Sequence, residues 1–313
     1  MLNLILMDNL SKQLNNINSI VDLIGDTPLI KLNGFNGLSS DKQIFIKAEW
    51  FNPGGSIKDR AALSMIKDGI NKKKLNSKKI IMESSSGNTA IAYAMIGSAL
   101  GFKVELVTPE NINIERKKTL QAYGAKIIYS SPFEGSDGAI IEARKMASKF
   151  PDKYFMPDQY NNEANPLAHY STTGPEIWDQ VDGKITHFIS GIGTSGTAMG
   201  TSKFLKEKNP NIKTIGVQPD NSLHGLEGLK HIPSSIVPGI YKESNLDEIF
   251  WANTEESYDV MEKLVKYEGM FVGHSGGAVV LAALEEIKKI EQAIVVCVIP
   301  DGGYRYLSGG VWW

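Results

Sequence analysis

Short apolar runs and amphipathic segments alternate along most of the chain. Runs typical of buried strands occur at residues 43–49, 79–83, 104–107, 126–129, 185–189, 212–217 and 293–299. Apolar or small residues at helical spacing predict a helix that begins near residue 58 and another that ends at Gly124. Further helices are predicted at residues 90–100, 198–209, 257–268 and 277–290. This βαβ alternation predicts an α/β fold with mostly parallel, doubly wound sheets covered by helices on both faces.

The 313 residues are enough for two domains. We predict an N-terminal α/β domain over residues 1–155 and a C-terminal one over residues 156–313. Whether residues near 20–40 pack on the C-terminal domain is left open. The segment 219–238 is rich in Gly, Pro and Ser and is too long for a simple connection, which is typical of a functional loop. Residues 1–18 are rich in asparagine and are expected to form a flexible or partner-clasping arm.

Composition excludes several classes of protein. The formal net charge is −2 with acids and bases interspersed, so nucleic acid is not an expected partner. The single cysteine, Cys297, lies in an apolar run, which predicts a buried, inert thiol and a reducing compartment. The histidines lack metal-ligand spacing, so no metal site is expected. The chain also lacks a recognisable signal peptide and any apolar run of membrane-spanning length.

The most informative stretch is the run Asn52-Pro53-Gly54-Gly55-Ser56-Ile57-Lys58 between a predicted strand and a predicted helix. The Pro, Gly and Ser residues suit a tight turn ending in a serine N-cap. At a helix start the positive end of the helix dipole disfavours the charged ammonium of a lysine and so lowers its pKa. Burial would lower this pKa further. Lys58 is therefore a candidate nucleophile and base, with an ordinary surface lysine as the alternative.

The turn at residues 191–197, with the sequence GIGTSGT, also joins a strand to a helix. Its free N–H groups, hydroxyls and helix dipole suit a phosphate. The turn matches GxGxxG, but the acid expected for a dinucleotide site is ambiguous, because Gln218 ends the next strand and Asp220 follows a proline. No lysine follows Gly196, which excludes a P-loop. Close helix–strand packing by small residues is the alternative.

Two more turns offer hydroxyl groups before a helix. Residues 84–89, SSSGNT, suit a carboxylate, and residues 273–277 contain Ser275; ordinary helix capping is the alternative for both. Together the four turns supply a lysine for an imine, a phosphate site, a carboxylate site and a hydroxyl for a ring nitrogen. These groups match pyridoxal phosphate carrying an amino acid, bound at the carboxyl ends of parallel strands.

In this order the four turns resemble those of the cysteine synthase family, which are fold-type II pyridoxal-phosphate enzymes. Asn161-Asn162 and residues 169–178, HYSTTGPEIW, resemble the type-B O-acetylserine sulfhydrylases most closely, and the similarity runs from about residue 20 to 311. The resemblance implies a fold like that of the tryptophan synthase β-subunit. It also implies a cytoplasmic homodimer that functions in cysteine biosynthesis.

The resemblance also implies roles for individual residues. Lys58 would carry the imine of pyridoxal 5'-phosphate, Asn88 would contact the ring hydroxyl, and Ser275 would face the pyridine nitrogen. The phosphate would be held by Gly193, Thr194, Ser195, Gly196 and Thr197, and the substrate carboxylate by Ser85, Ser86, Thr89 and Gln159. The chain departs from the family pattern at Ser85, Ala90, His274 and residues 301–304, which leaves the identity of the substrates open.

The implied reaction is β-replacement on O-acetylserine by sulfide (or thiosulfate), giving L-cysteine through an aminoacrylate. Alternatives are a cystathionine β-synthase, an O-phosphoserine-dependent synthase or a cysteine lyase that releases sulfide. A dehydrogenase would not explain Lys58 or residues 84–89, and Lys58 argues against a non-enzymatic binding protein. The segment 219–238 has no arginine for a phosphorylated substrate, and its Lys230 and His231 are expected to be solvated.

Overall fold

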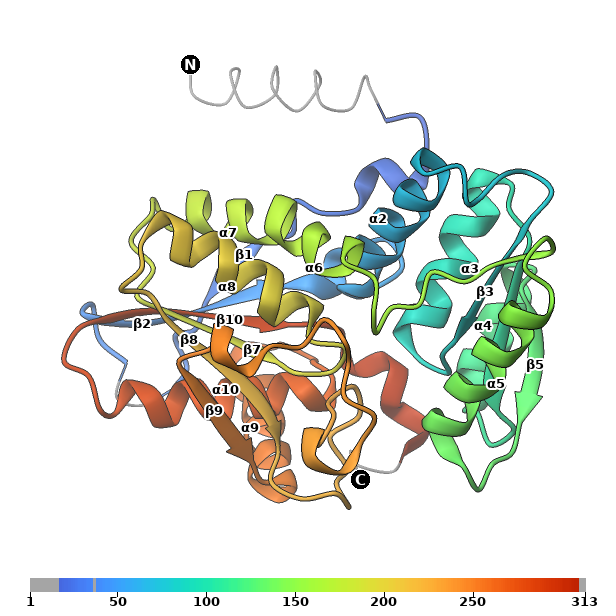
Figure 1. The fold of residues 1–313 in the computed structure, drawn as a ribbon. Helices are drawn as coiled ribbons and strands as arrows, with labels where there is room; N and C mark the ends of the chain where they lie inside the picture. Colours follow the sequence, from blue (N-terminus) through green and yellow to red (C-terminus); the bar gives the residue numbers. More distant parts are fainter. Residues whose placement is uncertain (1–16, 36–37, 310–313) are drawn as a thin grey trace.

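A computed structural model describes residues 17–35 and 38–309, and within these ranges the strands form one six-stranded and one four-stranded sheet (Figure 1). The larger sheet has the order β1 (Leu29–Lys31), β2 (Lys42–Ala48), β10 (Ala293–Ile299), β7 (His187–Gly191), β8 (Lys213–Pro219) and β9 (Glu248–Ala252). The smaller sheet has the order β5 (Lys126–Ser130), β4 (Val104–Pro109), β3 (Ile80–Ser84) and β6 (Tyr154–Phe155). In this part of the chain only β1 and β2 pair antiparallel.

Helices cover both faces of each sheet. They are α2 (Lys58–Asn71), α3 (Asn88–Leu100), α4 (Ile114–Ala122), α5 (Gly135–Lys149), α6 (Ala164–Ala168), α7 (Gly174–Gln180), α8 (Gly196–Lys208), α9 (Thr254–Glu268) and α10 (His274–Ile287). In Figure 1, α7 and α8 lie on one side of the larger sheet and α9 and α10 on the other. The smaller sheet has α2, α3 and α4 on one face and α5 on the other.

Strand β10 shows why a central strand of such a sheet is continuously apolar. Val295, Cys297 and Ile299 join the core under α9 and α10, while Val296 and Val298 join the core under α7 and α8. Alternate residues of a strand point to opposite faces, so a strand covered on both sides needs apolar side chains at every position. The doubly wound α/β prediction is confirmed, as is the buried Cys297, whose thiol pKa is raised by burial.

Some elements were not predicted. Strands β1 and β6 span three and two residues, too few to show a period. Helix α5 opens with Gly-Ser-Asp-Gly, residues with poor helix propensity. The stretch from α6 to α7 contains Pro166, Gly174 and Pro175 and includes a π-helical turn over His169–Thr173. Shortness hides β1 and β6, and Gly and Pro residues hide the helical segments; the short strand β9 was also missed, although its Ile249, Phe250 and Trp251 favour a strand.

The first strands of the chain belong to the larger sheet, because β2 pairs along its whole length with β10. The division into domains at residue 155 stays a prediction. The segment 219–238 is irregular, as predicted, except for a short 3-10 turn at Ile232–Ser234. The predicted N-terminal arm lies almost entirely outside the described residues. Of the helices that the structure describes, none has the length and apolar character needed to cross a membrane.

A buried network of charges joins the start of α2 to β2 and α7. The Arg60 guanidinium donates to both oxygens of Glu49, at 2.8 and 2.9 Å, and to both oxygens of Glu176, at 2.5 and 2.7 Å. Lys47, whose side chain is fully buried, lies 2.6 Å from Glu176. The two carboxylates therefore balance the charges of Arg60 and Lys47. Arg60 is two residues after Lys58 on the same helix.

We predict that Arg60→Met lowers the free energy of unfolding by about 3–5 kcal/mol, because Glu49 would be left as a buried, unpaired charge. Urea denaturation of the apoprotein measures this change. The control is Lys72→Met at the C-cap of the same helix, whose partly exposed ion pair with Asp68 is expected to contribute less than about 1 kcal/mol. Equal effects of the two substitutions would contradict a stabilising role for the buried network.

Candidate active site

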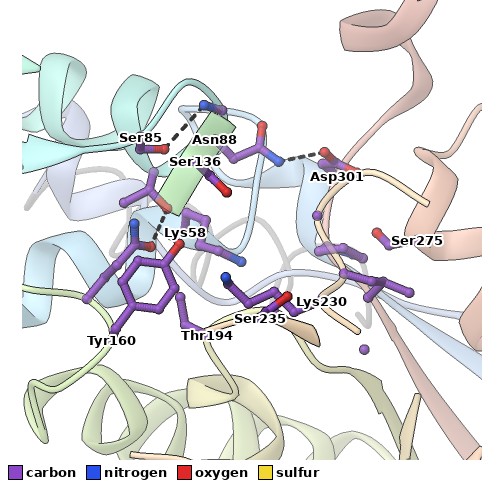
Figure 2. Close-up of a pocket in the computed structure, with 18 of the residues that line it drawn as sticks. Lys58, Ser85, Asn88, Ser136, Tyr160, Thr194, Lys230, Ser235, Ser275 and Asp301 are labelled. Atoms are coloured by element: carbon purple, nitrogen blue, oxygen red, sulfur yellow. Dashed lines mark hydrogen bonds between the residues drawn. The ribbon is translucent and has the colours of Figure 1, made fainter. Parts of the chain in front are cut away.

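The four turns singled out in the sequence meet at one pocket of about 840 Å³ (Figure 2). Residues 84–89 follow β3 and residues 191–196 follow β7, so both lie at carboxyl ends of parallel strands. The pocket is lined by Lys58, Ser85, Asn88, Thr89, Gln159, Gly193, Thr194, Thr197 and Ser275. Ser86, Ser195 and Gly196 are absent from the lining, although each belongs to a turn that contributes to it.

The helices that begin at this pocket lack side-chain caps. The N-cap residues of α2, α3, α8 and α10 are Ile57, Gly87, Ser195 and Gly273, and within the described chain none of them makes a side-chain capping bond. Ser56 was predicted to be an N-cap, but it precedes that position, and its Oγ accepts from the Lys58 N–H at 3.3 Å. The Ser85 Oγ accepts from the N–H of Gly87 at 3.2 Å, so a local turn bond accounts for one hydroxyl of residues 84–89. No capping bond in the described chain accounts for Ser275.

By contrast, two helices that begin elsewhere have conventional caps. The side chain of Asn113 accepts two N–H bonds at the start of α4, and that of Asn253 does the same for α9. A helix leaves its first N–H groups without partners inside the helix, and their dipoles favour negative charge. Uncapped helix starts around one pocket are thus well suited to bind anionic groups such as phosphate or carboxylate.

Lys58 occupies the start of α2 and lines the pocket. Burial lowers the pKa of its ammonium group, although the negative charges of Asp301 and Glu49 act in the opposite direction. In the described residues, no carboxylate forms an ion pair with its Nζ. The neutral amine, which is the nucleophilic form, is therefore favoured more than in an exposed lysine.

Gln159 is tied to the turn at residues 84–89. The Thr89 hydroxyl donates to Gln159 Oε1 at 2.8 Å, and Gln159 Nε2 donates to the Ser84 carbonyl at 3.3 Å. The buried Glu83 accepts from the N–H groups of Ser84 and Gln159 at 2.9 and 3.1 Å, and burial raises the pKa of its carboxyl group to about 7. These bonds place polar groups from two distant segments on the same wall of the pocket.

The glycine-rich turn packs closely against its surroundings. A Cβ at Gly193 would lie 2.5 Å from the Gly228 carbonyl oxygen, and one at Gly196 would lie 2.0 Å from Asn165 Oδ1. Asn165 Nδ2 donates to the Thr194 hydroxyl at 3.1 Å and to the Gln159 carbonyl at 2.7 Å. Close packing thus accounts for two of the glycines, and Asn165 joins this turn to the Gln159 wall.

Sequence reasoning missed several residues of the pocket. Tyr160, Asp137 and Lys230 all line it. Lys230 was expected to be solvated, but its side chain is 13% exposed and its Nζ lies 3.4 Å from Asp137 Oδ1, so that expectation was wrong. Asp301 follows β10 and is also buried at the pocket. No local motif signalled these contacts, since each partner comes from a distant part of the chain.

Comparison with known proteins agrees with this site. Residues 20–301 match the family described as pyridoxal-phosphate dependent enzyme. The cysteine synthase of Aquifex aeolicus (strain VF5) is 48% identical over 296 residues, covering 93% of this chain and 90% of that protein. Cysteine synthase B of Escherichia coli (strain K12) is 40% identical over 295 residues, covering 94% and 96%.

The likeness extends to solved structures. The crystal structure of cysteine synthase (OASS) from Entamoeba histolytica matches with a TM-score of 0.90 and 35% identity, covering 95% of this chain and 90% of that chain. This match confirms the fold-type II architecture. The chain therefore belongs to the cysteine synthase family of pyridoxal-phosphate dependent enzymes.

Proposed function

We propose that the protein is a cysteine synthase that uses pyridoxal phosphate to replace the acetate of O-acetylserine with sulfide, forming L-cysteine. The observation that carries the proposal is the convergence of Lys58 and several uncapped helix starts on one pocket. The names of the similar proteins support it. They do not favour a cystathionine β-synthase, an O-phosphoserine-dependent enzyme or a cysteine lyase.

The residues present fit the cofactor. The buried Ser195 hydroxyl has no hydrogen-bond partner in the described chain, and it lies at the uncapped start of α8. A phosphate held by the turn from Gly193 to Thr197 would supply the missing acceptors for this turn and for the first N–H groups of α8. By the family resemblance, Asn88 would contact the ring hydroxyl and Ser275 the ring nitrogen, and both residues line this pocket.

The substrate carboxylate would be bound by Ser85, Ser86 and Thr89 around the start of α3, together with Gln159, which accepts from the Thr89 hydroxyl. Lys58, favoured in its neutral form, would hold the cofactor and then remove the α-proton of the bound amino acid. When bound, pyridoxal phosphate supplies an electron-accepting ring that eases loss of the β-substituent. The hydroxyl of Ser275 would hold the ring nitrogen with less protonation than a carboxylate would.

We also propose that the protein is a cytoplasmic homodimer, as the family resemblance implies. Light scattering coupled to gel filtration tests the oligomeric state, and a monomer mass would contradict it.

We predict that Lys58→Ala lowers turnover by at least about 10³-fold, because both the attachment point and the base are removed. After borohydride reduction, mass spectrometry should find the cofactor attached to the parent protein but not to this variant. Lys67→Ala, an exposed change on the same helix, is the control and should behave like the parent. Cofactor still attached to Lys58→Ala would place the reactive lysine elsewhere.

We predict that Ser275→Asp slows β-replacement by about 10–100-fold and changes the visible absorbance of the bound cofactor, because a carboxylate would keep a proton on the ring nitrogen. Ser275→Thr retains the hydroxyl and is expected to keep the parent's absorbance. Stopped-flow spectra with O-acetylserine measure both effects. A parent-like spectrum in Ser275→Asp would show that residue 275 does not face the ring nitrogen.

A phosphorylated serine would bring a second dianion into the pocket, and Lys230, already paired with Asp137, offers only a partly neutralised charge. We expect kcat/KM for O-acetylserine to exceed that for O-phosphoserine by about 100-fold, with Lys230→Ala changing the ratio by less than about threefold. A preference for O-phosphoserine that is lost in Lys230→Ala would contradict this and make Lys230 the anchor of the leaving group.

A further inference from the structure

The segment that follows β10 contacts two of the catalytic turns at once. The Ile57 N–H donates to the Pro300 carbonyl at 2.9 Å, and the Gly273 N–H donates to the Asp301 carbonyl at 3.1 Å. Asp301 is 1% exposed and lines the pocket. The chain after the last strand therefore lies between the lysine turn and the turn that carries Ser275.

Side chains from this segment bind both ends of the Asn88 amide. Asn88 Nδ2 donates to Asp301 Oδ2 at 2.6 Å, as Figure 2 shows, and Arg305 Nη1 donates to Asn88 Oδ1 at 2.6 Å. A guanidinium has only donors and an ionised carboxylate only acceptors, so the amide can satisfy both partners in one orientation only. A flipped amide would present its NH₂ to Arg305 and its oxygen to Asp301.

Other contacts hold the two partners of Asn88 in place. Arg305 Nη2 donates to the Gly54 carbonyl, and the glycine at 55 leaves room for the guanidinium, since a Cβ there would lie 2.6 Å from Nη2. The Tyr306 hydroxyl donates to Asp301 Oδ2, and the Tyr306 ring packs against His274 with centroids 4.4 Å apart. Bonds to the backbone of the lysine turn and to buried rings thus limit the movement of Arg305 and Asp301.

We propose that Asp301 and Arg305 are positioning residues that hold the Asn88 amide with its nitrogen toward the cofactor. The proposal rests on the proposed function, in which Asn88 contacts the ring hydroxyl. The Nδ2 group has two hydrogens; Asp301 accepts one, which leaves the other for the ring oxygen. In the flipped state an amide oxygen would face the ring oxygen, and two acceptors would oppose each other. The pair therefore controls the binding of the cofactor through Asn88.

The test measures the dissociation constant of pyridoxal phosphate and the visible circular dichroism of the bound cofactor, which reports the orientation of its ring. Asp301→Asn keeps the shape but offers donors as well as acceptors, so residue 301 no longer disfavours the flipped amide of Asn88 and Arg305 alone holds its orientation. We expect cofactor affinity about tenfold weaker and a dichroism band shifted toward that of Asn88→Ala. Arg305→Met should act in the same direction. Tyr304→Phe, an exposed change in the same segment, is the control and should match the parent.

A double-mutant cycle separates this role from a general structural one. If Asp301 acts through Asn88, adding Asp301→Asn to Asn88→Ala should change cofactor affinity by less than about twofold. A full tenfold loss in that background would mean that Asp301 acts independently and would overturn the proposal. Unchanged affinity and dichroism in both Asp301→Asn and Arg305→Met would also overturn it.

Urea denaturation of the apoproteins identifies any variant that fails to fold. If Asp301→Asn does not fold, Arg305→Met combined with Asn88→Ala completes the same cycle and decides the proposal. A parent protein that binds no pyridoxal phosphate would overturn the proposed function and this proposal together. A parent that binds normally, with variants that bind equally well, would overturn this proposal alone.

Discussion

The structure depends on helix starts that no side chain caps. An α-helix leaves its first N–H groups without internal partners, and α4 and α9 satisfy theirs with asparagine caps. The helices that begin at the pocket have no such caps in the described chain. Their dipoles make this side of the pocket electropositive, which suits the phosphate and carboxylate that we propose bind there. Binding of these groups to the folded state would also stabilise it, by mass action.

Such a site needs turns from distant segments to keep fixed positions relative to one another. Buried polar contacts hold them in these positions. Arg60 anchors the start of α2 to Glu49 and Glu176, so the backbone on either side of Lys58 has little freedom. Asn165 and Gln159 connect the glycine-rich turn to residues 84–89. Breaking any of these contacts would leave a buried polar group without a partner, which makes the arrangement cooperative.

The same pocket has to favour both a neutral lysine and bound anions. Burial lowers the pKa of the Lys58 ammonium, while the helix starts attract anions through backbone dipoles that carry no titratable proton. Anion binding therefore does not require further cations near Lys58, and Lys230 at the pocket is neutralised by Asp137. This division of roles would allow one pocket to bind a phosphate, as we propose, while the neutral form of Lys58 stays favoured.

Features that depend on a few neighbouring residues were determined by the sequence alone. The run at residues 293–299 became β10, and the turns around Lys58, Asn88, Gly193 and Ser275 revealed the cofactor chemistry, because apolar periodicity and turn residues act locally. Only the tertiary structure decided the partners of Arg60, the pairing of Lys230 with Asp137 and the orientation of the Asn88 amide. Arg305 lies 217 residues from Asn88, and such contacts follow from how sheets and helices pack, which no local pattern encodes.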